Sequence, residues 1–250
     1  MERQQVAVVT GGTGGIGTAM CRQLNDAGYQ VAACYCSGGP TSEKAAQWKE
    51  AQAKDGYQFH TFYVDVSDFE SCQRCVLDIE ETLGPISVLV NNAGITRDTT
   101  LKKMDVDQWQ DVIRTNLDGV FNMTRPTING MLERQYGRVI NIASINGQKG
   151  QFGQANYSAA KAGIHGFTKA VAQEVARKGV TVNTISPGYV DTAMIQAVPD
   201  EIREQIRQGI PVGRFGQPED IARTVVFLAD EKASYITGAD FSINGGQYMH

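Results

Sequence analysis

Three residues in the middle of the chain have the types and spacing of a proton-transfer site, Ser144, Tyr157 and Lys161. Residues four apart on a helix are neighbours, so a Tyr-x-x-x-Lys pair places a phenol beside an ammonium group. A fixed cation favours the phenolate, and we expect it to lower the pKa of Tyr157 from its ordinary value of about 10. Tyr157 could then donate a proton to a carbonyl oxygen. An isolated pair of this kind is more often a solvated helix face, so other motifs must support the interpretation.

Ser144 ends an apolar run that begins at Arg138 and predicts a buried strand. Its hydroxyl is therefore expected at the carboxyl end of that strand. Open α/β sheets bind their ligands at this edge. The sequence thus predicts that the Ser144 hydroxyl lies where such a sheet binds a ligand.

The start of the chain predicts a phosphate-binding turn. A short β-rich run, 6–10, leads directly into the glycine-rich stretch 11–17 and then into an amphipathic helix through Leu24. Glycines let the backbone approach a pyrophosphate, and a helix amino end offers free N–H groups and a positive dipole. The spacing is Gly-x-x-x-Gly-x-Gly and not Gly-x-Gly-x-x-Gly. A flexible loop is the alternative, which the flanking strand and helix disfavour.

Further motifs follow in a fixed order: Asn91-Asn92-Ala93-Gly94, Asn116, the Ser144, Tyr157 and Lys161 set, and Pro187-Gly188. With the glycine turn, they resemble the short-chain dehydrogenase/reductase family. The resemblance covers essentially the whole sequence, from Val6 to Gly246. It implies a nicotinamide-dependent oxidoreductase with a doubly wound sheet.

The alternation of apolar runs and helical segments predicts the same fold independently. Seven runs are predicted as strands, at 6–9, 29–34, 58–64, 86–90, 138–142, 181–185 and 240–243. Strands that alternate with helices form a parallel sheet with helices on both faces. We expect one Rossmann-type α/β domain over residues 1–250, since this length can bury a large core and no linker or repeat interrupts it.

Composition excludes several other classes of protein. The net charge of −4 gives no general attraction to nucleic acid. The first residues, 1–5, contain an acid and leave no room for a signal sequence, and no apolar run approaches the roughly 20 residues that span a bilayer. We expect a soluble, cytoplasmic protein that binds no membrane.

The cysteine and histidine patterns predict no metal site. Cys21, Cys34, Cys36, Cys72 and Cys75 are odd in number, and only the last two have Cys-x-x-Cys spacing. We expect reduced, structural thiols. His60, His165 and His250 are scattered along the chain.

The family resemblance implies roles for the catalytic residues. Ser144 and Tyr157 would hydrogen-bond the substrate oxygen, and Tyr157 would donate the proton. Lys161 would hold the nicotinamide ribose, and Asn116 would hold a water that connects the lysine to solvent. The polar segment 199–209 is expected to be a mobile lid.

The same resemblance implies a set of cofactor-binding residues. They are Gly11, Thr13, Gly14, Gly15, Ile16, Gly17, Asp65, Val66, Asn91, Asn92, Ala93, Gly94, Lys161, Pro187, Gly188 and Val190. The Asn-Asn-Ala-Gly turn is also expected to tie neighbouring backbone together.

The choice between NADH and NADPH depends on the residues after the second strand. An acid there binds the ribose 2′-hydroxyl and repels a 2′-phosphate, whereas an arginine does the reverse. The run 31–37 offers neither, and 39–43 lacks the arginines that NADPH-using relatives carry. We expect both cofactors to work. An arginine introduced at Ser42 is expected to favour NADPH.

Within the family, the glutamine-rich run 145–157, with 94–98 and Lys103, is similar to the bacterial acetoacetyl-CoA reductases of polyhydroxyalkanoate synthesis. The positions that contact substrate in that group correspond to Asp98, Lys103, Gln151, Phe152, Gln154 and Tyr189. The resemblance implies reduction of acetoacetyl-CoA to (R)-3-hydroxybutanoyl-CoA by a homotetramer.

Two alternatives stay open. A 3-oxoacyl-[acyl-carrier-protein] reductase shares the catalytic residues, and it needs a basic surface for its acidic carrier protein. Here Gln135 stands where such relatives often have a basic residue, although Arg134, Arg177 and Lys178 are nearby in sequence. A catalytically silent nucleotide sensor or scaffold is the other alternative, disfavoured because all four catalytic positions are intact.

Overall fold

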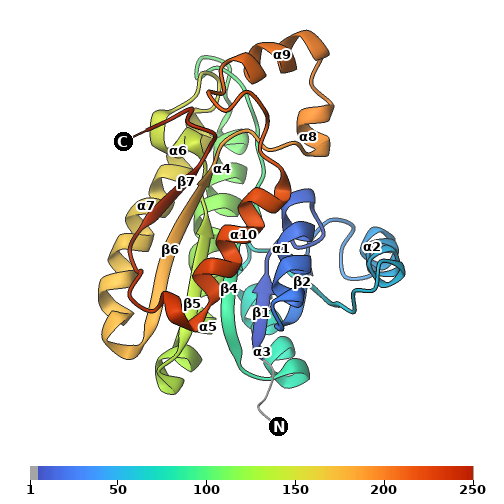
Figure 1. The fold of residues 1–250 in the computed structure, drawn as a ribbon, viewed down its shortest axis with the longest axis vertical. Coiled ribbons are helices and arrows are strands. Elements are labelled where there is room, and N and C mark those ends of the chain that lie inside the picture. The colour runs from blue at the N-terminus through green and yellow to red at the C-terminus, as the bar shows by residue number, and fades with distance from the viewer. Residues whose placement is uncertain (1–4, 250) are drawn as a thin grey trace.

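The computed structural model describes residues 5–249, and the predictions that concern residues 1–4 and His250 lie outside the described part. A central parallel sheet runs through the molecule, with its carboxyl edge at the top of Figure 1. The strands are β1 (Val6–Val9), β2 (Gln30–Tyr35), β3 (His60–Tyr63), β4 (Ile86–Asn91), β5 (Gly137–Ile142), β6 (Val180–Pro187) and β7 (Asp240–Ile243). The predicted seven strands are confirmed, with ends that differ by one or two residues.

Ten α-helices are described: α1 (Gly15–Asp26), α2 (Glu43–Lys54), α3 (Phe69–Leu83), α4 (Val106–Ile113), α5 (Gly119–Arg134), α6 (Ile145–Lys149), α7 (Ala155–Val175), α8 (Ala193–Gln196), α9 (Asp200–Gln208) and α10 (Pro218–Ala229). Short 3-10 turns lie at Ala176–Lys178 and Glu231–Ala233. A π-helix, Arg114–Asp118, joins α4 to α5. No helix in the described part is long and apolar enough to cross a membrane.

The strand order is β3-β2-β1-β4-β5-β6-β7, with all six pairings parallel. The order therefore reverses between β1 and β4, which creates a crevice at the carboxyl edge of the sheet. Loops that follow these two strands carry the glycine turn and the Asn-Asn-Ala-Gly turn. The Rossmann-type fold predicted from the sequence is confirmed.

Alternate residues along each strand pack against opposite layers of helices. Ala7 and Val9 of β1 pack with apolar residues of α1 and α10, whereas Val6 and Val8 pack with α3, α5 and α7. Strands buried on both faces explain why the sequence shows continuous apolar runs.

The five cysteines form no disulfide. Cys36 is exposed and the other four are buried, with the sulfur atoms of Cys34 and Cys75 3.9 Å apart. Burial raises the pKa of Cys72 to about 12, so this thiol stays protonated at neutral pH. Within residues 5–249, no group of three acidic, histidine or cysteine side chains is arranged to hold a metal ion.

Candidate active site

The glycine turn and the Asn-Asn-Ala-Gly turn are hydrogen-bonded into one unit at the carboxyl edge. Main-chain N–H groups of Asn92 and Ala93 donate to Thr10 Oγ1 at 2.9 and 3.0 Å. The Asn92 side-chain amide donates to the carbonyls of Thr10 and Gly11 at 2.9 and 3.3 Å. The expectation that this turn ties neighbouring backbone is confirmed, and it fixes the floor of the crevice.

Two glycines in the first turn are required by close backbone packing. A Cβ atom at Gly17 would lie 2.2 Å from the Gly11 carbonyl oxygen, and one at Gly12 would lie 3.0 Å from the Val9 carbonyl oxygen. The turn therefore closes tightly on the start of α1.

The amino end of α1 is open to an anion. Its N-cap residue, Gly14, makes no side-chain cap, and Gly14 and Gly15 are exposed. Unpaired N–H groups at a helix amino end bind phosphate. Thr13 and Ile16 flank this opening half-buried. This end of the helix fits the pyrophosphate of a dinucleotide.

Ser144, Tyr157 and Lys161 are brought together beyond the end of β5, as the sequence predicts. Ser144 is the N-cap of α6, and its Oγ accepts the main-chain N–H of Asn146 at 3.1 Å. The Ser144 hydroxyl is near enough to the Tyr157 phenol to lower the pKa of that phenol. Lys161 is buried with its Nζ 5.7 Å from the centroid of the Tyr157 ring.

The electrostatics of Tyr157 differ from the expectation. Burial raises the pKa of the Tyr157 phenol above its ordinary value, the Ser144 hydrogen bond lowers it and the Asp98 charge raises it further. The prediction that Lys161 lowers this pKa was wrong, since burial is the largest influence on the phenol and raises its pKa. Burial also lowers the pKa of Lys161 to about 8, although its Nζ donates to the Ile142 carbonyl at 2.7 Å. The Tyr157 phenol is therefore protonated at neutral pH and ready to donate.

Asn116 lies fully buried inside the π-helix. Its side-chain amide donates to the Ile95 carbonyl and accepts the Ile95 N–H, both at 2.8 Å. Both ends of the amide thus hold the loop after β4 in place. A Cβ atom at Gly94 would come within 3.3 Å of Asn116 Oδ1 and 3.6 Å of Lys161 Nζ, so these three residues converge. Because the side chain is engaged, a water bound by Asn116 would use its main chain.

The remaining predicted cofactor residues also lie on the carboxyl edge. Asp65 follows β3 and accepts the Ser67 N–H and hydroxyl through one oxygen, Oδ1, while Val66 is buried. Pro187 ends β6, and a Cβ atom at Gly188 would lie 2.8 Å from Asn244 Cα. Val190, buried, forms a parallel bridge with Gly216. Their contacts with a cofactor stay a prediction.

The loop after β2 corrects one detail of the cofactor prediction. Ser42 is 7% exposed and caps α2 by accepting the Ala45 N–H. An arginine there would remove the cap and enter the interior, so Ser42 is a poor place to test 2′-phosphate binding. Thr41 is the exposed neighbour. The Tyr35 hydroxyl donates to the Pro40 carbonyl at 2.9 Å and closes the loop.

The predicted substrate residues divide into two groups. Asp98 and Gln154 are joined directly, because the Gln154 amide donates to the Asp98 carboxylate at 2.7 Å. Asp98 also raises the pKa of Tyr189, which burial raises most, so its charge reaches that ring. In contrast, Phe152 is 86% exposed and Lys103 is an exposed turn residue. Gln151 is half-buried and accepts from Lys149 at 3.4 Å.

Sequence reasoning missed two buried asparagines. Asn146 donates its side-chain amide to Gln154 Oε1 at 2.8 Å. Asn156 donates to the carbonyls of Arg97 and Gln108 at 3.1 and 3.0 Å and accepts the Tyr157 N–H at 2.8 Å. Its position next to Tyr157 in the sequence was the only available signal. It fixes the start of α7 against α4.

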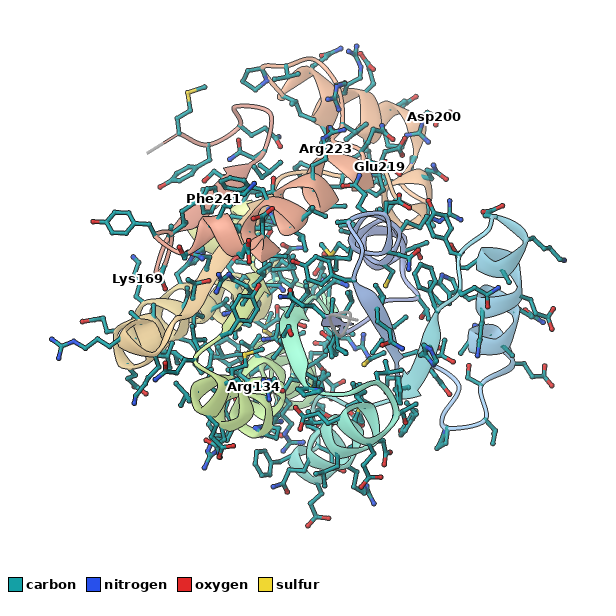
Figure 2. The ribbon with its side chains drawn as sticks, turned by 60° about the horizontal axis from the view of Figure 1, so that its bottom comes forward. Arg134, Lys169, Asp200, Glu219, Arg223 and Phe241 are labelled. Carbon is teal, nitrogen blue, oxygen red and sulfur yellow. The ribbon has the colours of Figure 1, made fainter. Side chains whose placement is uncertain are left out.

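The segment predicted as a lid, 199–209, forms α9, which lies with α8 at the top of the molecule in Figure 1. No residue of α9 is fully buried. In Figure 2, Asp200 of α9 lies on the same side as Glu219 and Arg223 of α10. The mobility of segment 199–209 stays a prediction.

Comparison with known proteins agrees with this geometry. The family model described as short chain dehydrogenase matches residues 5–203. An acetoacetyl-CoA reductase of Allochromatium vinosum is 55% identical over 98% of this chain and 99% of its own, and one of Cupriavidus necator is 49% identical over the same shares. A 3-oxoacyl-[acyl-carrier-protein] reductase FabG of Staphylococcus aureus is 42% identical over the full length of both chains. The chain therefore belongs to the short-chain dehydrogenase family.

Proposed function

We propose that this protein reduces acetoacetyl-CoA to (R)-3-hydroxybutanoyl-CoA with a reduced nicotinamide cofactor. The observation that carries the proposal is the convergence of Ser144, Tyr157 and Lys161 on the edge that also holds the glycine turn. The acetoacetyl-CoA reductases that are about half identical over nearly the whole chain support the substrate. Supply of a polyhydroxybutyrate precursor is the metabolic role that we infer.

In the proposed mechanism the nicotinamide supplies the hydride, and the protein positions and polarises the substrate. Ser144 and Tyr157 hydrogen-bond the 3-oxo oxygen, and the Tyr157 phenol gives its proton to that oxygen as negative charge develops there. An ammonium group has three N–H donors, and the Ile142 carbonyl takes one from Lys161. The others are available for the ribose hydroxyls, and the positive charge stabilises the phenolate that remains.

The open amino end of α1 and the Gly17 packing support binding of the pyrophosphate. Between β2 and α2, residues 36–42 contain no acid and no arginine. We therefore propose that NADH and NADPH are both used. The residues given above for the cofactor and the substrate are proposed contacts.

A carrier-protein substrate is the second candidate, favoured by the 42% identical reductase of that name. The basic residues suggested for its landing surface lie elsewhere. Arg177 and Lys178 precede β6, so they lie at the amino end of a strand whose carboxyl end forms the site. Arg134 ends α5 just before β5, at the same amino edge, and it appears in Figure 2 on the end of the molecule turned toward the viewer. Within one chain this favours the CoA ester.

We further propose a single domain that works in the cytoplasm as a homotetramer. Exposed apolar side chains on the helices that flank the site, Phe121 on α5 and Trp109 on α4, are suitable for subunit contacts.

The test is the initial rate of NADH and NADPH oxidation with acetoacetyl-CoA and, in parallel, with an acetoacetyl carrier protein. Faster turnover of the CoA ester supports the proposal, and the same assay gives the cofactor preference. Preference for the carrier protein would assign the enzyme to fatty-acid elongation. Absence of turnover with all four combinations would refute both.

A further inference from the structure

Asn146 contacts both the catalytic serine and the start of the catalytic helix. It is the second residue of α6 and is 8% exposed. Its main-chain N–H donates to Ser144 Oγ at 3.1 Å, and its side-chain amide donates to Gln154 Oε1 at 2.8 Å. No role for this residue follows from the proposed reaction itself.

The hydrogen bonds from Asn146 to Asp98 have only one allowed direction. An ionised carboxylate only accepts, so Gln154 must turn its NH2 group toward Asp98, where the distance is 2.7 Å. Its carbonyl then faces Asn146, which must donate. Asn146, the buried member of this row of hydrogen bonds, therefore sets the orientation of the Gln154 amide. Through Gln154 it also sets the orientation of the Asp98 carboxylate.

The segments that carry these residues are fixed relative to one another. A Cβ atom at Gly147 would lie 2.7 Å from the Lys161 carbonyl carbon, which shows that α6 is packed directly on α7. Gln154 is the N-cap residue of α7, and the Thr99 N–H donates to the Gly153 carbonyl at 2.8 Å. The exposed Asp98 is thereby held where its charge reaches Tyr157 and Tyr189.

We propose that Asn146 is a positioning residue, which fixes the amide of Gln154 and so aims the Asp98 carboxylate at an amide N–H of the substrate's pantetheine arm. This inference rests on the proposed function, since it assumes a pantetheine thioester. The carboxylate oxygen not bonded to Gln154 would accept the N–H in a charge-assisted hydrogen bond. Without the Asn146 donor, Gln154 could turn its carbonyl toward Asp98 and repel it.

The test compares two acetoacetyl thioesters that differ in one amide. The N-acetylcysteamine thioester has an amide N–H, and the S-ethyl thioester has none. Asn146→Leu keeps the size and removes the donor, so we expect its KM for the N-acetylcysteamine thioester to rise about tenfold, with kcat and all S-ethyl constants within about twofold of wild type. Lys169→Met, an exposed change on α7 away from the proposed substrate contacts, is the control and should alter neither the amide-thioester nor the S-ethyl constants.

A second variant tests the direction of the hydrogen bonds. Asn146→Asp can only accept while ionised, so its KM for the amide thioester should exceed that of Asn146→Leu at neutral pH. Protonation restores a donor, and the KM should therefore recover toward wild type as the pH is lowered. A structural defect relieved by protonation would recover on both thioesters, whereas the proposed role predicts recovery on the amide thioester alone.

Three results would overturn the proposal. One is an equal loss on both thioesters, which would mean that Asn146 acts through Ser144 or through folding. Another is wild-type discrimination between the thioesters in Asn146→Leu, and the third is no recovery of Asn146→Asp at low pH. If wild-type protein reduces neither these thioesters nor acetoacetyl-CoA, the proposed function itself has failed.

Discussion

A buried cation lies at each end of strand β5, and the two differ in how many of their N–H donors are hydrogen-bonded. At the amino end, the Arg138 guanidinium donates to the carbonyls of Gly137, Gly179, Asp230 and Glu231. It also lies 4.5 Å from the centroid of the Tyr136 ring. At the carboxyl end, Lys161 donates to one carbonyl, that of Ile142, and burial lowers its pKa to about 8.

The difference separates a structural charge from a reactive one. Arg138 has nearly all of its donors occupied by the fold, so it joins β5 to the segments that follow α10 and precede β6. Lys161 donates to one carbonyl of the protein, and the loss of solvent around its ammonium group destabilises the charged form. Of these two cations, the one with donors left over lies on the edge where a ligand could accept them.

The largest expected effect is on turnover at the reactive end. Tyr157→Phe removes the phenol that lies beside Ser144 and leaves the ring in place. We expect kcat to fall about a thousandfold, because general acid catalysis is lost. Cofactor affinity, measured by nicotinamide fluorescence, should stay within about twofold. Near-normal turnover would contradict the assignment of Tyr157 as proton donor.

Lys161→Met should separate activity from stability. We expect kcat/KM to fall about a hundredfold, since charge stabilisation at the site is lost. The folded protein should nevertheless gain about 2 kcal/mol at pH 7, because a pKa lowered from 10.5 to about 8 costs about 3 kcal/mol and the Ile142 hydrogen bond offsets part of it. Urea denaturation measures this difference, and a destabilised variant would contradict it.

The stability gain of Lys161→Met should depend on pH in a defined window. Between pH 8 and 10.5 the unfolded chain keeps the Lys161 proton, whereas the folded protein has lost it. The contribution of Lys161 to the free energy of unfolding of the wild type therefore becomes more favourable as the pH rises through this range. The advantage of the variant should therefore be full below pH 8 and vanish by about pH 10.5. Subtracting the wild-type curve of unfolding free energy against pH from that of Lys161→Met removes the contribution of the buried cysteines, which both proteins share.

Arg138→Met tests the structural end. Removal of the guanidinium leaves four carbonyls without their donor, and we expect a loss of about 3 kcal/mol in the free energy of unfolding. The kcat of the protein that remains folded should stay within about twofold, because Arg138 is at the edge opposite the site. A large drop in kcat without loss of stability would break the distinction between the two ends.

The smallest effect is expected from a new cation on the reactive edge. Thr41→Arg adds an exposed guanidinium in the loop that follows β2, with all donors available. We expect the ratio of kcat/KM for NADPH over NADH to rise about threefold, as an exposed ion pair contributes little. Thr41→Gln is the uncharged control. An unchanged ratio would place the 2′-phosphate elsewhere.

The sequence predicted the strands, the two turns and the convergence of Ser144, Tyr157 and Lys161 because each depends on local spacing. Asn116 interrupts the helical pattern of 106–134 in the sequence, but an interruption alone does not show that the backbone forms a π-helix there or that Asn116 is buried. The pKa of Tyr157 was predicted with the wrong sign because spacing shows a neighbouring lysine but not the loss of solvent. Asn146 was missed because its partners come from tertiary packing, not from a motif. Features that depend on burial therefore required the structure.

The hydrogen bonds between Thr10 and Asn92 have a thermodynamic consequence. They join segments 82 residues apart, and they tie the two turns at the carboxyl edge to each other through contacts within the protein itself. A nucleotide that binds there does not need to order these turns, so it should lose little affinity to conformational entropy. Calorimetry of nucleotide binding should then show a heat-capacity change close to that of rigid docking, without the additional term of a folding loop.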